Sequence, residues 1–458
     1  MAKSSDSRRA RRNVILAAVV AGISGLLFGY DTGVIASALL FITPEFGLNT
    51  LESGIIVASV PIGAAAGATL AGPISDRYGR RYPILGAAAL FIVGSAIGAA
   101  APEAFVLVIA RLIIGLAIGA ASGTAPVYVS EIAPPEIRGR LVTVFQLSIT
   151  VGILIAYLVG LVFEPIDGWR WMIGLGVIPA LVLGIGIFRM PKSPRWLVMA
   201  GQDYAARKVL NQIREHDPGA IDHELEGIKR EVEAEPGTWH DVFSNPVIRA
   251  ALLVGLGLAL FQQLTGINTV IYYAPQIVQL TGITSDSAAI IAALGVGVVN
   301  VGMTVLAVRY VDRAGRRPLL IFGTGVMALA LFGLGASFIG ADTDTWSSIL
   351  AIGSLLTYVA AFAISLGPIF WLVNSEIFPM EVRSKAAGLC VTVSWVANFA
   401  VSLTFLVLLS ELGNIGTFWL YGAICVLALL FAVRYVPETK GKRLEQIQEI
   451  FRARAGVS

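Results

Sequence analysis

Long apolar runs recur along this chain of 458 residues, and they limit what it can fold into more than any other feature. A run of about 20 apolar residues spans the hydrocarbon core of a bilayer as a helix, because a helix satisfies its own backbone hydrogen bonds there. Charged residues make up 14% of the chain, against roughly 25% in a soluble domain. The sequence therefore predicts an all-α membrane protein with twelve transmembrane helices. The runs lie near residues 14–41, 51–75, 83–101, 104–130, 141–163, 171–190, 247–278, 287–309, 318–340, 347–376, 385–409 and 415–436.

Cationic side chains crowd every second connection between the runs. The opposite connections are nearly free of them, with Arg170 as the exception. Because Lys and Arg in short loops stay on the cytoplasmic side, both termini and the polar insert 191–246 are expected in the cytoplasm. Within the insert, 204–213 and 221–233 have the spacing of short amphipathic helices. The clustered cations are Arg77, Arg80, Arg81, Arg138, Arg140, Arg309, Arg313, Arg316, Arg317, Arg383 and Lys385.

The second half of the chain repeats charged motifs of the first. "GPISDRYGRR" follows the second run and "DRAGRR" the eighth; "PKSPRWL" closes the sixth run and "PETKGK" the twelfth. A glutamate and an arginine seven residues apart follow both the fourth and the tenth run. Such matched elements are typical of a duplicated bundle. We expect two pseudo-symmetric six-helix bundles, 1–190 and 247–436, joined by a cytoplasmic helical linker, 191–246, and followed by a cytoplasmic tail, 437–458.

Taken together, these motifs resemble the sugar porter family of the major facilitator superfamily, over essentially the whole chain. "PPEIRGR", "QQLTGIN" and "SEIFPMEVR" also occur in that family's order and spacing. The resemblance implies two halves that rock about a central sugar site in a cell inner (plasma) membrane. It implies a monosaccharide and a proton as partners, with no nucleic acid, no cofactor and no metal, and a chain that functions as a monomer.

The charged loops are candidate gates. Fixed arginines can pair with carboxylates at matched spacing and with the carbonyl ends of helices; the alternative is that they only set topology. In "PKSPRWL" the residue after the first proline is Lys192, where the family usually has glutamate. This departure puts part of the gate in the amino-terminal half in doubt. The candidate gating residues are Asp76, Arg77, Arg80, Glu131, Arg138, Asp312, Arg313, Arg316, Glu376, Arg383 and Glu438, with Tyr272 and Tyr273 resembling the family's outer gate.

One carboxylate and one guanidinium, Asp31 and Arg111, lie well inside the apolar runs. Counted from the outer ends of their helices at about 1.5 Å per residue, their depths agree to within about 6 Å, so they can meet. An aspartate beside a fixed cation favours its charged form, and one that is separated and buried favours its neutral form. Such a group can load and release a proton, and the family's proton symporters carry this pair. The alternative is a static salt bridge.

A sugar site needs amides for hydroxyls and aromatic rings for the apolar faces of the sugar. "TGINT" in the seventh run is expected to interrupt the helix beside such groups. Each amide or tryptophan side chain alone can equally be a contact between helices. As a set these side chains match the sugar ligands of the family. Ile153 resembles the glucose-type pattern, and Ser394 occupies a place that often carries an amide. The candidate sugar ligands are Gln146, Gln262, Gln263, Asn268, Asn300, Trp371, Trp395 and Asn398.

These features leave several functions open. We expect proton-coupled symport of a hexose, with D-glucose as the first candidate. Alternatives are a passive uniporter, a symporter for xylose or galactose, and a membrane sugar sensor, although the short tail disfavours a sensor. A membrane enzyme would need a nucleophile–base or metal constellation, and none can be assembled. All three histidines lie in the polar insert, so none is available as an intramembrane proton carrier.

Overall fold

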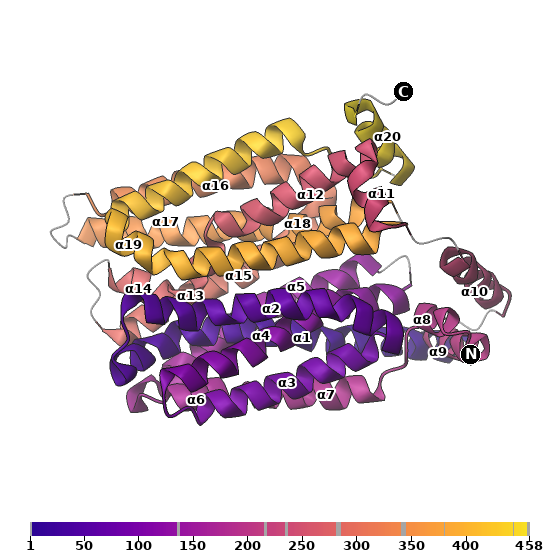
Figure 1. Ribbon diagram of the computed structural model, residues 1–458, viewed down its shortest axis with the longest axis horizontal. Coiled ribbons are helices and arrows are strands. Elements are labelled where there is room, and N and C mark those ends of the chain that lie inside the picture. Colours follow the sequence, from indigo (N-terminus) through magenta and orange to yellow (C-terminus); the bar gives the residue numbers. More distant parts are fainter. Residues whose placement is uncertain are drawn as a thin grey trace.

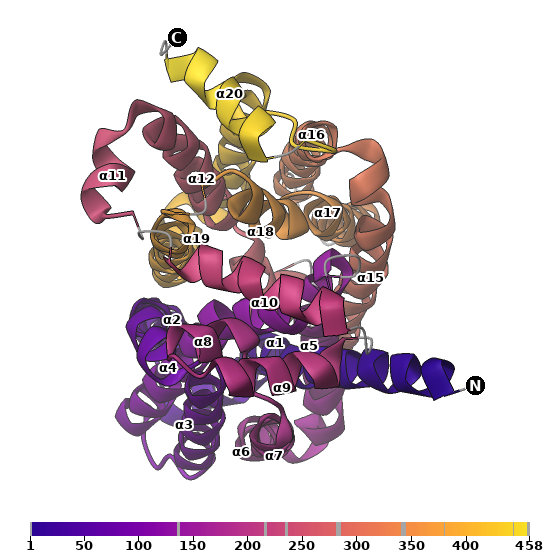
Figure 2. The same ribbon diagram turned by 90° about the vertical axis from the view of Figure 1, so that its right-hand side faces the viewer.

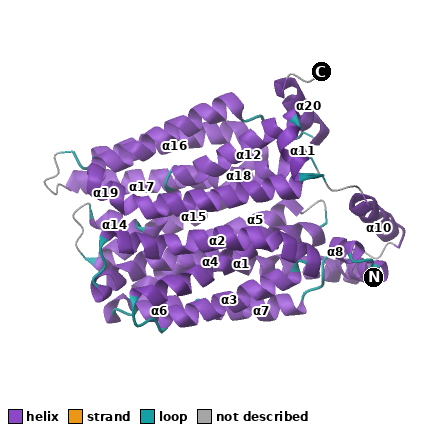
Figure 3. Cartoon of the chain, viewed as in Figure 1, coloured by secondary structure: helices purple, strands orange, loops and turns teal. Residues whose placement is uncertain are grey.

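Helices account for nearly all of the ordered backbone in the computed structural model of this chain (Figure 3). The structure describes residues 2–134, 138–214, 218–233, 237–280, 285–339, 345–379, 381–442 and 444–455. No strand occurs in these ranges. The fold is therefore all-α, as the apolar runs predict.

The first half contributes one bundle, drawn in indigo to magenta in the lower part of Figure 1. Its helices are α1 (Ala2–Phe46), α2 (Thr50–Tyr78), α3 (Arg81–Ala99), α4 (Ala104–Ile132), α5 (Arg138–Phe163), the 3-10 helix η1 (Glu164–Ile166), α6 (Trp169–Gly174) and α7 (Val177–Arg189). The insert that follows holds α8 (Pro194–Met199), α9 (Asp203–Ile213), α10 (Pro218–Glu233) and α11 (Trp239–Ser244). Two of these, α9 and α10, are the amphipathic helices that the sequence predicts.

The second half forms the other bundle, above the first in Figure 1, and ends in a tail helix. Its helices are α12 (Pro246–Leu264), α13 (Ile267–Tyr272), α14 (Ala274–Gln279), α15 (Asp286–Ala314), α16 (Arg316–Ala336), α17 (Thr345–Ile364), α18 (Leu366–Glu376), α19 (Arg383–Tyr435) and the tail helix α20 (Leu444–Ala455). Both chain ends lie at the end of the molecule that carries α8 to α11 and α20, which we call the insert end (Figures 1 and 2).

Within the described ranges, eleven helical segments are long and apolar enough to cross a membrane. The last of them, α19, has 53 residues and leaves helical geometry at Gly413, where φ is 66° and ψ is 178°. A single crossing needs only about 20 residues, so α19 supplies two. This gives the twelve crossings expected from the sequence.

The seventh crossing breaks where "TGINT" predicts a break. α12 ends at Leu264, and Gly266 adopts φ = +90°, a left-handed conformation that glycine tolerates best. The freed carbonyl of Thr265 accepts a hydrogen bond of 2.8 Å from the Tyr358 hydroxyl. This arrangement places the amides of the seventh crossing beside an interrupted backbone.

Helices α2 and α4 pack closely through glycines at four-residue steps. A Cβ atom at Gly63, Gly67, Gly115 or Gly119 would overlap backbone atoms of the facing helix. At Gly123 it would lie 3.6 Å from the Ala71 side chain, an ordinary contact. The closest approach therefore lies at the first two glycines of α4, and the helices are slightly further apart at Gly123. This packing sets the position of Arg111 between its neighbours.

The insert contacts both bundles. The side chain of Asn13 in α1 donates to the Gln212 carbonyl of α9 (3.2 Å), while Gly237 donates to the Glu381 carbonyl (3.0 Å). Lys385 in α19 donates back to Gly237 (2.8 Å). Figure 2, which looks onto this end, shows α8 and α9 over the first bundle. The insert is thus a physical link between the halves.

Candidate functional site

Asp31 of α1 and Arg111 of α4 face each other inside the first bundle. Their side chains are 3% and 1% exposed, and Nη1 of Arg111 lies 3.3 Å from Oδ1 of Asp31. Nε of Arg111 donates to the Ile56 carbonyl at 2.7 Å. The other oxygen of Asp31 and Nη2 of Arg111 make no hydrogen bond. Because a buried charge is costly without partners, the Asp31 carboxylate depends on this one ion contact.

Two contacts connect the surroundings of this pair to the second bundle. The ring of Phe28, one turn before Asp31 on α1, packs on Trp395 of α19 with centroids 5.1 Å apart. The Tyr272 hydroxyl of α13 accepts from the Asn398 amide at 3.5 Å and lies within electrostatic range of the Asp31 and Arg111 charges. Candidate sugar ligands on α19 are therefore close to the candidate proton carrier.

Three of the predicted amides form one network around the break in the seventh crossing. Asn268 donates to Oε1 of Gln263 at 2.7 Å, and Nε2 of Gln263 donates to Oε1 of Gln262 at 3.3 Å. The Gln262 amide also donates to the Leu366 and Gly367 carbonyls at the start of α18 (3.4 and 3.3 Å). Amides of this kind can donate to and accept from sugar hydroxyls.

Ser394 completes this network, although its spacing alone did not mark it as a partner of the two glutamines. Its hydroxyl accepts from Nε2 of Gln263 at 2.9 Å and approaches Oε1 of Gln262 at 3.4 Å. The sequence signal was its place before Trp395, a position that often carries an amide in the family it resembles.

The remaining predicted ligands do not join the network. Gln146 in α5 and Asn300 in α15 make no hydrogen bond to the described part of the chain, and Asn300 is buried. Trp371 in α18 packs on the ring of its neighbour Phe370. In the described part of the chain no hydrogen bond joins these three side chains to the glutamines.

At the end opposite the insert, the seam between the bundles is closed by α13 and α14. The Tyr157 hydroxyl of α5 donates to the Ile271 carbonyl (2.9 Å), and Gln276 donates to Ala36 of α1 (3.4 Å). Tyr273 stacks on Phe405 with ring centroids 5.0 Å apart. The two candidate gate tyrosines thus lie in the segment that bridges the halves at this end.

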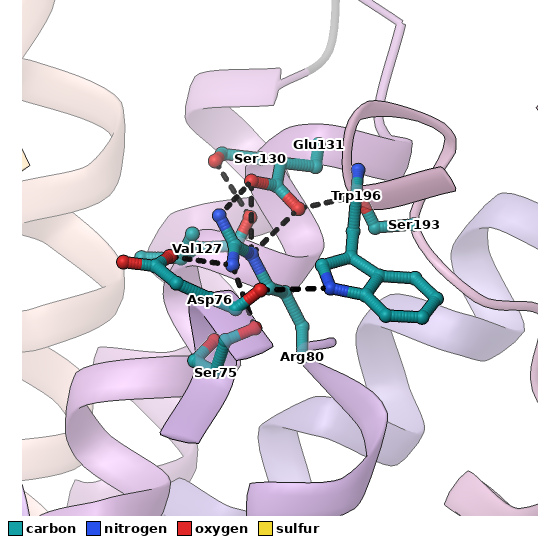
Figure 4. Close-up of polar contacts among 8 residues, drawn as sticks. All are labelled: Ser75, Asp76, Arg80, Val127, Ser130, Glu131, Ser193 and Trp196. Atoms are coloured by element: carbon teal, nitrogen blue, oxygen red, sulfur yellow. Dashed lines mark hydrogen bonds and ion pairs between the residues drawn. The ribbon is translucent and has the colours of Figure 1, made fainter. Parts of the chain in front are cut away.

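At the insert end, Arg80 is the centre of a buried clamp in the first bundle (Figure 4). Its Nε lies 3.1 Å from both oxygens of Glu131, and its Nη1 contacts Asp76 and the Ser75 carbonyl at 2.9 Å each. Burial by itself would lower the pKa of Arg80, but Glu131 and Asp76 outweigh it and raise that pKa above its ordinary value. The clamp is therefore an ion pair that binds the ends of α2 and α4 together.

The second bundle repeats this clamp. Arg316 contacts Glu376 at 2.9 Å and donates to the Val311 carbonyl, five residues earlier, as Arg80 does to Ser75. The preceding glycines, Gly79 and Gly315, have φ of 90° and 92°. A Cβ there would press against the Trp196 ring and the Glu438 carboxylate, at 2.9 and 2.6 Å.

Two hydroxyls that the sequence analysis missed complete the clamps. Ser193 donates to Glu131 at 2.5 Å, and Thr439 donates to Glu376 at 2.6 Å. Each stands two residues after the first proline of its motif. That matched position was the available signal.

The other candidate gating residues have varied environments. Arg77 is exposed and lies over the Tyr78 ring. The Arg313 carbonyl accepts from Lys440, and Nε of Arg383 donates to the Phe378 carbonyl (3.1 Å). The side chains of Arg138 and Asp312 lie outside the described residues.

Within the part of the chain that the structure describes, no group of three or more His, Cys, Asp or Glu side chains is placed to hold a metal ion. The polar groups in the described interior include the ion pair, the amide network and the clamps. This set suits the binding of a neutral polar solute and a proton.

A family model described as "Sugar (and other) transporter" matches residues 17–451. The chain belongs to this family. Among relatives of this sugar transporter, a glucose transporter, GlcP, of Staphylococcus epidermidis is 40% identical over 449 residues, 98% of this chain and 99% of the relative. A galactose-proton symporter of Escherichia coli is 41% identical over 430 residues, 94% of this chain and 92% of the relative.

Solved structures agree with this assignment. The xylose transporter XylE from E. coli, in a partially occluded inward-open conformation, superposes with a TM-score of 0.82 at 35% identity, over 94% of this chain and 100% of that chain. The family resemblance drawn from the motifs is confirmed, as is the twelve-helix fold. This sugar transporter is an integral membrane protein, and its relatives are transporters rather than enzymes.

Proposed function

We propose that this chain is a proton-coupled symporter of a hexose, with D-glucose as the first candidate, in the plasma membrane. The single observation that carries the proposal is the contact between Asp31 and Arg111, 3.3 Å apart and almost completely buried. Buried ion pairs contribute little to stability, because desolvation cancels much of their attraction. A pair in this setting is better explained as a group that changes its protonation during transport.

Proton entry supplies enough free energy for the task. One charge crossing 100 mV contributes about 2.3 kcal/mol, and one pH unit contributes about 1.4 kcal/mol. Their sum, roughly 4 kcal/mol, corresponds to about a thousandfold accumulation of sugar. Loss of a proton from Asp31 would restore its attraction to Arg111 and draw α1 toward α4.

Alternating access is assigned to two opposite sets of contacts. The clamps around Arg80 and Arg316, each within its own bundle, brace the helix ends at the insert end. We place this end in the cytoplasm together with both termini and assign the clamps to its closed state. The α13–α14 segment, with Tyr272 and Tyr273, closes the other end. Between them the sugar would contact Gln262, Gln263, Asn268, Trp395 and Asn398, with Gln146, Asn300 and Trp371 on the surrounding helices. One chain holds all of these groups, so a monomer should suffice.

Glucose is preferred as the candidate because of Ile153, which is buried in α5 (2% exposed). An isoleucine at this position leaves fewer polar groups around the proposed sugar site than a second amide would. Relatives that carry galactose or xylose show that the family scaffold accepts other monosaccharides.

Uptake by proteoliposomes with an imposed pH gradient tests the proposal. The unmodified protein should concentrate labelled glucose, and unlabelled xylose, galactose and fructose should compete less well than glucose. Asp31→Asn should abolish concentration while leaving counterflow exchange, because exchange needs no net proton movement. Asp167→Asn is the matched control, since Asp167 is exposed in a turn at φ = 50°, a conformation that asparagine tolerates.

Two results would contradict the proposal in different ways. If Asp31→Asn still concentrated sugar, proton coupling would lie elsewhere. If the unmodified protein equilibrated sugar without acidifying the lumen, the chain would be a passive uniporter. If another monosaccharide competed better than unlabelled glucose, glucose would be rejected as the preferred substrate and proton coupling would be unaffected.

A further inference from the structure

Three guanidinium groups gather at the insert end of the second bundle, around the last residues of α19. Nη2 of Arg317, at the start of α16, donates to the Val433 carbonyl at 2.7 Å. Nη1 of Arg454, in the last turn of α20, donates to the Tyr435 carbonyl. The guanidinium of Arg434 lies 5.7 Å from the Tyr435 ring centroid. Three helices therefore bring one cation each to the same place.

These cations have no carboxylate partner in the described part of the chain, where none of the three forms an ion pair. Nε of Arg317 is buried without a hydrogen bond. Burial, together with the nearby charges of Arg317 and Arg434, lowers the pKa of Arg454 below its ordinary value. The cluster is thus a concentration of positive charge that repels itself.

Glu438 lies close to the cluster, but its charge is already engaged. Its oxygens accept from the backbone N–H groups of Arg316 (3.0 Å), Arg317 (3.1 Å) and Lys440 (2.8 Å). A carboxylate at the N-terminus of α16 also interacts with the positive end of that helix. Glu438 therefore caps a helix and does not neutralise the three guanidinium groups.

A surface hollow of about 530 Å3 adjoins the cluster, lined by Arg317, Pro318, Ile321, Phe322 and Glu438. Phe322 is 65% exposed, and Leu430 on the neighbouring part of α19 is 58% exposed. Figure 1 shows α16 and the end of α19 running along one edge of the molecule toward α20. In a membrane protein such exposed apolar side chains face acyl chains. The hollow therefore meets the arginine cluster through Arg317, which lines it beside Glu438, and is apolar along Ile321 and Phe322.

We propose that this hollow binds an anionic phospholipid, with its phosphate on Arg317, Arg434 and Arg454 and an acyl chain along Ile321 and Phe322. Guanidinium groups suit phosphate because they present several N–H donors in a planar fork. A free phosphate ion would satisfy the arginines but not the apolar half of the hollow, which favours the lipid. Such a lipid would hold α20 against α16 and α19. This inference does not depend on which solute is transported.

Native mass spectrometry of the purified full chain, titrated with phosphatidylglycerol or phosphatidylcholine of equal chain length, tests the site. We expect phosphatidylglycerol to bind at least tenfold more tightly. The double variant Arg434→Gln, Arg454→Gln should lose that preference, because both side chains are exposed and their removal leaves the core intact. Arg452→Gln, on the same turn of α20 but outside the cluster, is the matched control and should keep it.

Several outcomes would overturn the proposal. The cluster is not the site if the double variant keeps the full preference for phosphatidylglycerol over phosphatidylcholine, or if Arg452→Gln loses that preference to the same extent. Displacement of phosphatidylglycerol by millimolar inorganic phosphate would show an ion site rather than a lipid site. If the double variant loosens α20, Arg434→Gln alone, which keeps the Arg454–Tyr435 bond, must still reduce the preference at least threefold.

Discussion

The Nζ atom of Lys192 lies 4.9 Å from the centroid of the Trp196 ring. In the second bundle the matching position is Glu438, which accepts backbone N–H groups at the start of α16. Helix α3, which matches α16, begins without a side-chain cap from its N-cap residue, Arg80. The two clamps therefore share their arginine and glutamate but differ at this position: a lysine lies over the Trp196 ring in the first, and a glutamate caps α16 in the second.

Lys192→Glu should make the first clamp resemble the second. A carboxylate at a helix N-terminus contributes about 0.3–1 kcal/mol, and up to about 2 kcal/mol when partly buried. One kcal/mol shifts a two-state equilibrium about fivefold, so we expect more of the closed insert end and slower turnover. Distances between spin labels on the two bundles, with and without the substitution, measure this. An unchanged distance distribution would mean that position 192 does not influence the clamp.

Thr439→Val should weaken the second clamp by removing its hydrogen bond to Glu376, 2.6 Å long in the structure. A hydrogen bond to a charged group contributes about 1.5–3 kcal/mol. The same labels should report a more open insert end, while Thr439→Ser, which keeps the hydroxyl, should behave as the unmodified protein. If both variants opened the clamp equally, the methyl group rather than the hydroxyl would be responsible.

Much of this architecture follows from the sequence because it rests on periodic or repeated signals. Apolar length fixes the crossings, and the internal repeat points to the contacts of Arg80 with Glu131 and Arg316 with Glu376. The Asp31–Arg111 contact agrees with the matched depths of two opposite charges in the apolar runs, although depth alone shows only that they can meet.

Other features depend on helix rotation and on short loops, which spacing does not determine. The hydroxyl of Ser394 reaches Gln263 because α12 and α19 face each other there. Gln146 and Asn300 carry the same amide chemistry but make no such contact. The break before α18 lies at Ser365, where ψ is −98°. Gly367 and Pro368 follow it, a pair typical of helix breaks, but the sequence analysis did not use this signal.

Ser394→Ala should weaken sugar binding if the network of Gln262 and Gln263 is the sugar site. Loss of one neutral hydrogen bond costs about 0.5–1.5 kcal/mol, which predicts a rise in KM of about two- to tenfold with little change in kcat. Initial rates of sugar uptake measure both. Ser410→Ala is the control on the same helix, because Ser410 is exposed and bonds only to Val407. Equal effects of the two substitutions would argue against the assignment.

Gly119→Ala should destabilise the first bundle, because the added Cβ would overlap the Ala64 backbone on α2. Overpacking typically costs about 1–3 kcal/mol, so the thermal unfolding temperature should fall. Gly123→Ala, one turn further along the same face, has room at 3.6 Å and should be neutral. Similar unfolding temperatures for the two variants would show that α2 and α4 separate easily.

Arg111→Gln should lower the stability of the fold more than the double substitution Asp31→Asn, Arg111→Gln, which removes both charges. Removing one member of a buried pair leaves the other without its partner, at a cost of about 3–5 kcal/mol, whereas Asp31→Asn with Arg111→Gln leaves two neutral amides that can bond to each other. We therefore expect the double variant to be more stable than Arg111→Gln alone and still unable to concentrate sugar. Thermal unfolding of the four members of this cycle gives the coupling between the two sites. Additive effects would mean that the 3.3 Å contact carries no interaction energy, and Asp31 would then lose the fixed cation on which its proposed proton exchange depends.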